Sequence, residues 1–457
     1  MLKTRWLSSV TPAILLALVT FASTLSAAEW KEKVLYSFQG GTDGSTPLGG
    51  VVFDSAGNVY GATQDGGSAS CRSIYECGTV YQLTPPATKG DAWTETVLYV
   101  FQGNAKNDGA SPFGGLVMDS SGNLYGTTAY GGTGDCVLLG SKLGCGAVFE
   151  LSPPAQKGGA WTEKILYSFP NSKRGYVPWG NLVFDKSGNL YASTIYGGDR
   201  GTTCDLFYGG QCGVVFELSP PKQKGGKWTE KVLHSFGAIA TGKQFGDGAS
   251  PNGELVFDDK GNVYGTTYLG GYNCPHNSGQ GCGTAFKLKP PTQKGGAWTE
   301  TILHRFNQDT SDNGLPSAGL VMDAKGNLYG TTVGTVFRLA PPSAKSSRWR
   351  ETILYTLGQD AYDPKGALIF DQSGDLYGTT YVGSGGSLQG SVFQLKPNKN
   401  GGWTFGVIHG FLGPPDGDFP TASLVFGKNG DLYSTTQAGG TGQACQGGCG
   451  TVFEVSP

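Results

Sequence analysis

The sequence predicts an all-β protein, a seven-bladed β-propeller with four strands in each blade. One repeat unit occurs seven times along the chain. Each unit holds four short runs rich in Val, Ile, Leu, Tyr, Phe and Thr, bounded by Gly, Pro, Asn and Asp. Beyond the N-terminal segment, no apolar run has the 3.6-residue period of a helix. A β-solenoid is the structural alternative, and its coils are usually shorter than these repeats.

The second copy shows the unit clearly: WTETVLYVF, a loop ending in DGASP, FGGLVMD, SSGN, LYGTT, a loop ending in GCG, and AVFELSPP. The Trp of the first segment falls at Trp30, Trp93, Trp161, Trp228, Trp298, Trp349 and Trp403. The Tyr of LYGTT falls at Tyr60, Tyr125, Tyr191, Tyr264, Tyr329, Tyr377 and Tyr433. This register separates the chain from disordered low-complexity sequences, although it contains 77 Gly and 24 Pro.

Each segment of the repeat has an expected place in its blade. We assign GLVFD to the innermost strand a, LYGTT to b, TVFEL to c, and the Trp-containing segment to the outermost strand d. A tight turn such as Asp119 to Asn123 joins a to b. Its Asp-x-x-Gly-Asn pattern could suggest a calcium loop, but Asp and Gly suit a turn and too few carboxylates follow.

The two ends predict how the ring closes. After residue 28 the chain begins with a strand d, Trp30 to Phe38, and it stops after a strand c, Gly450 to Val455. Every blade has four strands only if the N-terminal strand d joins the C-terminal strands a to c. We therefore expect residues 29–457 to form a single closed propeller domain, which leaves no open ring.

Residues 1–28 have the layout of a secretory signal peptide. Lys3 and Arg5 precede an apolar run at 13–19, and Ser26-Ala27-Ala28 offers a cleavage site. The run is too short for a membrane span, although an uncleaved anchor is the alternative. We expect a secreted or periplasmic monomer without a membrane span after cleavage. The net charge of −2 gives no indication of a nucleic-acid partner.

Ten cysteines form five local pairs, each within a b–c loop. The pairs are Cys71/Cys77, Cys136/Cys145, Cys204/Cys212, Cys274/Cys282 and Cys445/Cys449. Copies five and six have shorter b–c loops and no cysteine, so the cysteines follow loop length. Export favours disulfides. A zinc site needs ligands that converge, whereas these pairs are distributed around a ring.

The repeat G-x-L-V-x-D-x-x-G-N-L-Y-G-T-T…G-G…G-x-V-F resembles the GloVer-type tandem repeat of exported bacterial "choice-of-anchor" proteins. The resemblance covers essentially all of residues 30–457. It implies an extracytoplasmic repeat protein and brings no reaction or catalytic residue. Members of the family often carry a C-terminal anchor, whereas this chain ends on Pro457 directly after a strand. We therefore expect release rather than tethering.

Function is expected where the copies depart from the repeat, on the face formed by the d–a and b–c loops. These loops place carboxylates at Asp43, Asp108 and Asp247, and aromatic rings at Tyr130, Tyr196 and Tyr272. Aromatic faces beside hydrogen-bonding carboxylates suit polyhydroxylated ligands such as sugars. The alternative is that the Asp residues cap turns and the Tyr residues pack the loops.

Copies three and four depart most strongly. Where other copies have a small residue before the Leu or Val of strand a, they carry Asn181 and Glu254. Copy three also adds Arg174, Tyr176 and Trp179 in its d–a loop. We therefore place the ligand site at this rim. The alternative is that Asn181 and Glu254 bond each other, or water, in the channel.

Three classes of function remain open: a binding or scaffolding propeller for a polysaccharide or cell-surface glycan, a lyase or hydrolase acting on a polysaccharide or lactone, and an envelope component. Glu254 and His276 are the candidate acid–base groups of the enzyme alternative. The histidines of strand d, His234, His304 and His409, replace a Tyr and are interpreted as packing residues. No cofactor or metal site is expected, because no P-loop, nucleophile elbow or His-rich motif is found.

Overall fold

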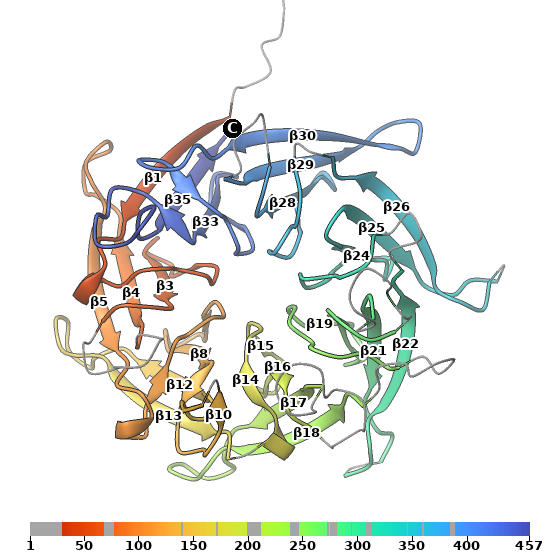
Figure 1. Ribbon diagram of the computed structural model, residues 1–457, viewed down its shortest axis with the longest axis horizontal. Helices are drawn as coiled ribbons and strands as arrows, with labels where there is room; N and C mark the ends of the chain where they lie inside the picture. Colours follow the sequence, from red (N-terminus) through yellow and green to blue (C-terminus); the bar gives the residue numbers. More distant parts are fainter. Residues whose placement is uncertain are drawn as a thin grey trace, which may run out of the picture.

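Seven antiparallel sheets stand around a central axis in the computed structural model (Figure 1). Each contains the four strands of one blade, and the sheet of blade three has a fifth strand in its d–a loop. The structure describes residues 30–67, 77–138, 140–170, 172–198, 212–237, 246–271, 274, 281–293, 295–307, 313–344, 346–358, 361–383 and 389–457. The expected signal peptide, residues 1–28, lies outside these ranges. The prediction of a seven-bladed propeller with four strands per blade is confirmed.

The strands follow the repeat, from innermost to outermost in each blade. Blade one has β2 (Val52–Phe53), β3 (Val59–Thr63), β4 (Thr79–Thr84) and β5 (Thr94–Val100). Blade two has β7 (Val117–Met118), β8 (Leu124–Thr128), β12 (Ala147–Ser152) and β13 (Thr162–Ser168). Blade three has β15 (Val183–Phe184), β16 (Leu190–Tyr196), β17 (Val214–Ser219) and β18 (Thr229–Ser235). Blade four has β19 (Val256–Phe257), β20 (Val263–Thr267), β21 (Thr284–Lys289) and β22 (Thr299–Arg305).

The remaining blades repeat this order. Blade five has β23 (Val321–Met322), β24 (Leu328–Thr331), β25 (Thr335–Ala340) and β26 (Arg350–Thr356). Blade six has β27 (Ile369–Phe370), β28 (Leu376–Thr380), β29 (Ser391–Pro397) and β30 (Trp403–Gly410). Blade seven has β32 (Val425–Phe426), β33 (Leu432–Thr436), β35 (Thr451–Ser456) and β1 (Lys31–Ser37). Short pairs join the loops: β6 (Gly109–Ala110) with β9 (Tyr130–Gly131), β10 (Val137–Leu138) with β11 (Ser141–Lys142), and β31 (Gly417–Asp418) with β34 (Ala438–Gly439), while β14 (Tyr176–Pro178) pairs with β16.

The ring closes by pairing its two ends, as the sequence predicts. β1 lies antiparallel to β35, from Lys31 opposite Ser456 to Ser37 opposite Thr451 (Figure 1). Just after β1, the fully buried Phe38 packs edge-to-face on Tyr81 of blade one, with 5.0 Å between ring centroids. The N-terminal strand therefore completes blade seven and also contacts the next blade.

One packing contact repeats between successive blades. The Phe that ends strand d lies against the aromatic ring of strand c in the next blade, with centroids 5.0–5.2 Å apart. The Gly of LYGTT leaves room for this ring: a Cβ on Gly126 would lie 2.6 Å from Phe149. Aromatic pairs at this spacing combine burial with favourable ring geometry. Six such contacts hold neighbouring blades together.

The a–b turn uses its own carboxylate, which supports the turn interpretation over a calcium loop. Asp119 Oδ1 accepts hydrogen bonds from the Ser121 and Asn123 backbone N–H groups at 2.8 and 2.9 Å. Its Oδ2 accepts from Asn123 Nδ2 and from the Tyr125 hydroxyl. Burial raises the pKa of Asp119, but these hydrogen bonds outweigh it and the net shift is downward. The same four donors close on the carboxylate at Asp185, Asp258 and Asp323, whereas blade six has Asp375 in place of the Asn and blade seven has Gly427 in place of the Asp.

Candidate functional site

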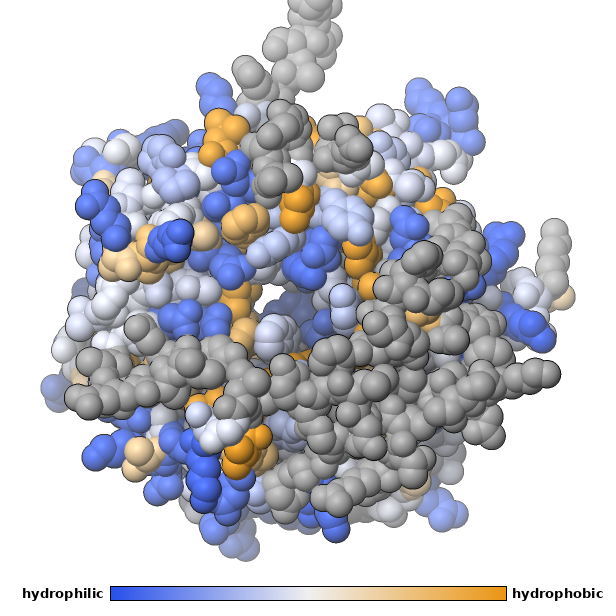
Figure 2. All heavy atoms as spheres, viewed as in Figure 1, coloured by the Kyte–Doolittle hydropathy of each residue, from blue (hydrophilic) through white to orange (hydrophobic). Residues whose placement is uncertain are grey.

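A cavity of about 780 Å³ lies on the propeller axis. Figure 2 shows the molecule hollowed at its centre. The cavity is lined mainly by the residues that follow one repeated Pro at the end of each d–a loop, together with the ends of the b strands. The first of these lining residues in blades one to seven are Leu48, Phe113, Trp179, Asn252, Ser317, Lys365 and Thr421.

The residue before that Pro is held in an unusual backbone conformation in every blade. Thr46, Ser111, Val177, Ser250, Leu315, Asp363 and Phe419 all have φ between 53° and 59°. Positive φ is costly for bulky and β-branched residues, so the surroundings must enforce it. The Val177 N–H donates to the carbonyl of Cys145 in the preceding blade at 3.1 Å. The b–c loop of one blade therefore positions the cavity lining of the next.

The disulfides stiffen this support. The second cysteine of each pair offers the carbonyl that receives the pre-proline N–H: Cys77, Cys145, Cys212, Cys282 and Cys449. The structure contains the predicted disulfides Cys136–Cys145, Cys274–Cys282 and Cys445–Cys449. Cys77 and Cys212 are also disulfide-bonded, while their predicted partners, Cys71 and Cys204, lie outside the described residues. These bonds indicate an oxidising compartment.

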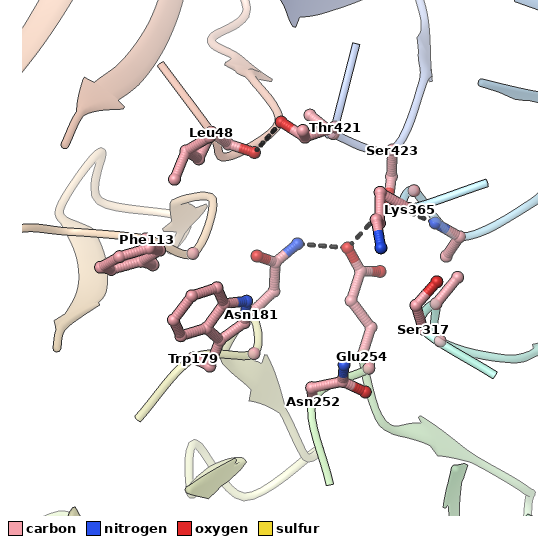
Figure 3. Close-up of a pocket in the computed structure, with 18 of the residues that line it drawn as sticks. Leu48, Phe113, Trp179, Asn181, Asn252, Glu254, Ser317, Lys365, Thr421 and Ser423 are labelled. Atoms are coloured by element: carbon pink, nitrogen blue, oxygen red, sulfur yellow. Dashed lines mark hydrogen bonds between the residues drawn. The ribbon is translucent and has the colours of Figure 1, made fainter. Parts of the chain in front are cut away.

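The cavity has an apolar side and a polar side. Blades one to three contribute Leu48, Phe113 and Trp179, whereas blades four to seven contribute Asn252, Ser317, Lys365 and Thr421 (Figure 3). The Trp179 and Phe113 rings lie 4.0 Å apart at 30°. Trp179 remains 37% exposed, which is unusual for so large an apolar side chain. An aromatic surface therefore faces polar groups across the cavity.

The polar side carries one close ion pair. Lys365 Nζ lies 2.9 Å from Asp363 Oδ1, and both residues line the cavity. The positive charge of Lys365 is thus matched locally. At the seam between blades seven and one, the Thr421 hydroxyl donates to the Leu48 carbonyl at 3.2 Å.

A hydrogen-bond network crosses the axis below these side chains. Glu254 Oε1 accepts from Asn181 Nδ2 of blade three and from the Ser423 hydroxyl of blade seven, the latter at 3.0 Å (Figure 3). Asn181 Oδ1 accepts from the Gly115 N–H at 2.5 Å. Ser423 Oγ accepts from the Ala367 N–H at 2.9 Å. Three side chains therefore link blades two, three, four, six and seven.

The Glu254 carboxyl is in a setting that favours its neutral form. Glu254 is half-buried and lines the cavity. Burial raises the pKa of Glu254, and the hydrogen bonds from Ser423 and Asn181 offset part of that rise. The Glu254 carboxyl can accept a hydrogen bond from a hydroxylated ligand.

The structure brings together four of the residues singled out in the sequence. Trp179, Asn181, Glu254 and Tyr196 all line the cavity. Asn181 and Glu254 also bond each other, as the alternative interpretation expected. His276 and Tyr272 lie outside the described residues.

The other candidate residues do not line the cavity. Their charged groups bond to neighbouring side chains instead. Asp43 accepts from the Tyr36 hydroxyl, Asp108 from the Tyr99 hydroxyl, and Asp247 lies 3.0 Å from His234 Nε2. Arg174 pairs with Glu230 at 2.5 Å. Tyr130 and Tyr176 are buried. The d–a loop turns its Asp back toward the outer strand d, because Tyr or His there supplies a hydrogen-bond donor.

Several lining residues were not predicted from the sequence, including Phe113, Ser317, Lys365 and Tyr381. A signal for the first three existed: the position after the repeated Pro varies completely among copies, while its neighbours are repeated. The side chain at such a position does not pack inside the blade, so the repeated structure does not restrict its residue type.

One family model matches the chain. The model of the Gloeobacter/Verrucomicrobia repeat matches residues 19–204, 136–334 and 276–457. The chain belongs to this family. No curated protein matches it. The repeat family thus agrees with the resemblance drawn from the sequence.

Solved structures with similar architecture share little sequence with this repeat protein. A glucose dehydrogenase-type oxidoreductase from Thermus thermophilus is 14% identical, with a TM-score of 0.43, over 93% of this chain and 100% of that chain. A luciferin-regenerating enzyme is 12% identical, with a TM-score of 0.43, over 94% and 95%. The PQQ domain of a pyranose dehydrogenase from Coprinopsis cinerea is 10% identical, with a TM-score of 0.42, over 94% and 96%. At these values the matches carry no argument about activity.

Across the described part of the chain, no helix is both long and apolar enough to cross a bilayer.

Proposed function

We propose that this chain is an exported binding protein that holds a neutral oligosaccharide in its axial cavity. The observation that carries the proposal is the partly exposed Trp179 ring, which packs against Phe113 and faces polar side chains across a cavity of about 780 Å³. A volume in this range suits a small ligand. A sugar ring offers an apolar face for the indole and hydroxyl groups for the opposite side.

Charge in the cavity supports a neutral ligand. Lys365 is matched by Asp363 at 2.9 Å, so it does not offer an uncompensated cation to a phosphate or carboxylate. Glu254 also lines the cavity and adds no positive charge that would attract an anion. Asn252, Ser317 and Thr421 add neutral hydrogen-bonding groups. A polyhydroxylated, uncharged molecule fits this set best.

The interactions that Glu254 and Asp363 already make favour binding over catalysis. Glu254 Oε1 already accepts two hydrogen bonds from side chains of other blades. Asp363 lies against Lys365. A general acid or base must be available to the reacting group, whereas these two carboxylates serve the architecture of the cavity. The enzyme alternative becomes an outcome of the test below.

Export is supported by two features. The N-terminal sequence has the layout of a signal peptide, and the disulfides require an oxidising compartment. We infer secretion or periplasmic release of the mature protein on these grounds.

The test is a glycan array probed with mature protein, followed by calorimetry on each hit. Trp179→Ala should weaken binding by roughly 10-fold or more, about 1.4 kcal/mol, because it removes the apolar surface on which the sugar ring would be buried. Val137→Ala is the matched control, since Val137 is also an exposed apolar residue and lies outside the cavity. Equal affinity of Trp179→Ala and wild type would refute the proposal. Consumption of the bound glycan would replace it with the enzyme alternative.

A further inference from the structure

The strand d residues and the d–a loop form a repeated cluster at the outer seam between blades. A Tyr or His of one strand d contacts the loop Asp, and a Glu from the next strand d lies beside them. In the seam between blades seven and one these are Tyr36, Asp43 and Glu95. At the seam between blades six and seven they are His409, Asp416 and Glu32. This last seam is where the N-terminal strand closes the ring.

Three metal-ligating atoms converge at that closing seam. One ligand atom from each of Glu32, His409 and Asp416 lies within 4.8 Å of the other two. Within the described part of the chain, no other three His, Cys, Asp or Glu side chains bring their ligand atoms this close together. All three are half-buried. The ligand set, one imidazole nitrogen and two carboxylate oxygens, is one that zinc and related divalent ions accept.

Two of these ligand atoms are buried without a hydrogen-bond partner: Glu32 Oε1 and His409 Nε2. His409 Nε2 lies 3.3 Å from Asp416 Oδ2, but without hydrogen-bond geometry. Two ligands of one tetrahedral ion, with bonds of about 2.0–2.1 Å, stand about 3.3–3.5 Å apart. The spacing therefore fits shared coordination better than a direct bond. A Glu Oε1 also lacks a partner at other seams (Glu95, Glu163 and Glu300), so the distinguishing observation at this seam is the unpartnered His409 Nε2, which a bound ion would explain.

Neighbouring groups also hold Asp416 and His409 in place. The Asp416 carboxylate accepts from the Leu412 and Gly417 N–H groups at 3.0 and 2.6 Å. The His409 ring packs edge-to-face on Phe411, with centroids 4.7 Å apart. Outer contacts of this type orient the ligands of metal sites. The ring therefore packs, as the sequence analysis expected, and it also directs Nε2 toward the two carboxylates.

A sister seam supplies an internal comparison. Between blades three and four the same residue types occur, as His234, Asp247 and Glu300. There His234 Nε2 and Asp247 Oδ2 are hydrogen-bonded at 3.0 Å, so the imidazole already has its partner. Blades three and four, like blades six and seven, are continuous in the chain, but at the closing seam the Glu comes from the N-terminal strand β1.

We propose that Glu32, His409 and Asp416 bind a divalent transition-metal ion that fastens the N-terminal strand β1 to blade six. Glu32 belongs to β1, while His409 lies on β30 and Asp416 lies in the loop that follows it. One ion therefore connects the first strand of the chain to a blade more than 370 residues away in sequence (Glu32 to His409). The role is structural, and it is independent of ligand binding in the axial cavity.

The test is calorimetric titration of EDTA-treated, tag-free mature protein with zinc chloride. Wild type should bind one zinc ion, and its melting temperature should rise when zinc is added. His409→Gln should bind zinc roughly 100-fold or more weakly than wild type. Even substitution of residues that only hydrogen-bond to metal ligands lowers metal affinity by about 10- to 100-fold. His234→Gln, the matched control at the sister seam, should bind zinc as wild type does.

A second variant protects the test from a folding defect. Glu32→Gln keeps the size of the side chain and should show the same loss of zinc affinity, with a zinc-free melting temperature close to wild type. Absence of zinc binding by wild type overturns the proposal. Zinc binding that survives both His409→Gln and Glu32→Gln overturns it as well, because the ion would then lie elsewhere.

Discussion

The Ser423 hydroxyl of blade seven donates a hydrogen bond to Glu254 Oε1 of blade four across the central channel, at 3.0 Å. Asn181 donates to the same oxygen. These side chains stand at the position where most other copies of the repeat carry Gly or Ala. The departures from the repeat thus act as one unit that spans the axis, rather than as independent substitutions.

Removing either donor from this unit should have a similar effect. Ser423→Ala leaves Glu254 with one donor and the Ala367 N–H without its acceptor, and should cost about 2 kcal/mol of unfolding free energy. Asn181→Ala should cost about the same, because it leaves the Gly115 N–H without its acceptor. Urea unfolding of both single variants and the double variant measures these costs. Since the two share Glu254, we expect them not to add; strict additivity would show that no coupled network exists.

Ring closure by β1 should carry a large part of the stability. A protein that begins at residue 41 lacks β1 and the buried Phe38, and loss of a core Phe side chain alone costs about 3–5 kcal/mol. A protein that begins at residue 30 is the control and should melt as the full mature chain does. If the shorter protein keeps the control's melting temperature, the closure has no energetic role.

Covalent pairing should be confined to single loops. Denatured, alkylated mature protein should contain no free thiol. Peptide mapping without reduction should recover Cys136–Cys145, Cys274–Cys282 and Cys445–Cys449, with Cys77 and Cys212 each joined to its predicted loop partner. Each short closure should contribute about 2–3 kcal/mol in the chain-entropy model. A bridge between two blades would contradict the local arrangement.

Stability should fall as pH rises through the range in which buried outer-strand carboxyls ionise. Burial, together with repulsion from Asp43, raises the pKa of Glu95 to about 7; burial and Asp108 do the same for Glu163. Between pH 4.5 and about 7 the unfolded carboxyls are ionised while the folded ones keep their protons, so unfolding releases protons. The stabilisation is complete below pH 4.5 and lost above 7. The Glu95→Gln/Glu163→Gln variant should show a shallower fall in urea midpoint over this range than wild type; an unchanged slope would contradict the assignment.

Most of the fold could be read from the sequence because it is local and repeated. The Trp, LYGTT and cysteine positions fix the blades, and the order of the terminal strands fixes the closure. Asn181 and Glu254 were identifiable as departures from the repeat. Their link to Ser423 was not, because it depends on the width of the ring and joins blades that are not adjacent.

The orientation of the loop carboxylates also could not be predicted from the sequence. Asp43 and Asp108 belong to the face expected to bind ligand, but their side chains turn toward Tyr36 and Tyr99 of the outer strand. That direction is set by loop geometry, which begins from Gly residues at positive φ such as Gly40 and Gly103. Sequence spacing shows that Tyr and Asp recur together, and it does not show which way the Asp points.

The most direct measurement of the central claim is a crystal structure of the mature protein with a glycan identified on the array. We expect density for the glycan in the axial cavity, with one sugar ring over Trp179 and hydroxyls directed at Asn252, Ser317 or Glu254. Density on the outer surface, for example beside Arg174 and Glu230, with the axial cavity occupied by solvent, would contradict it.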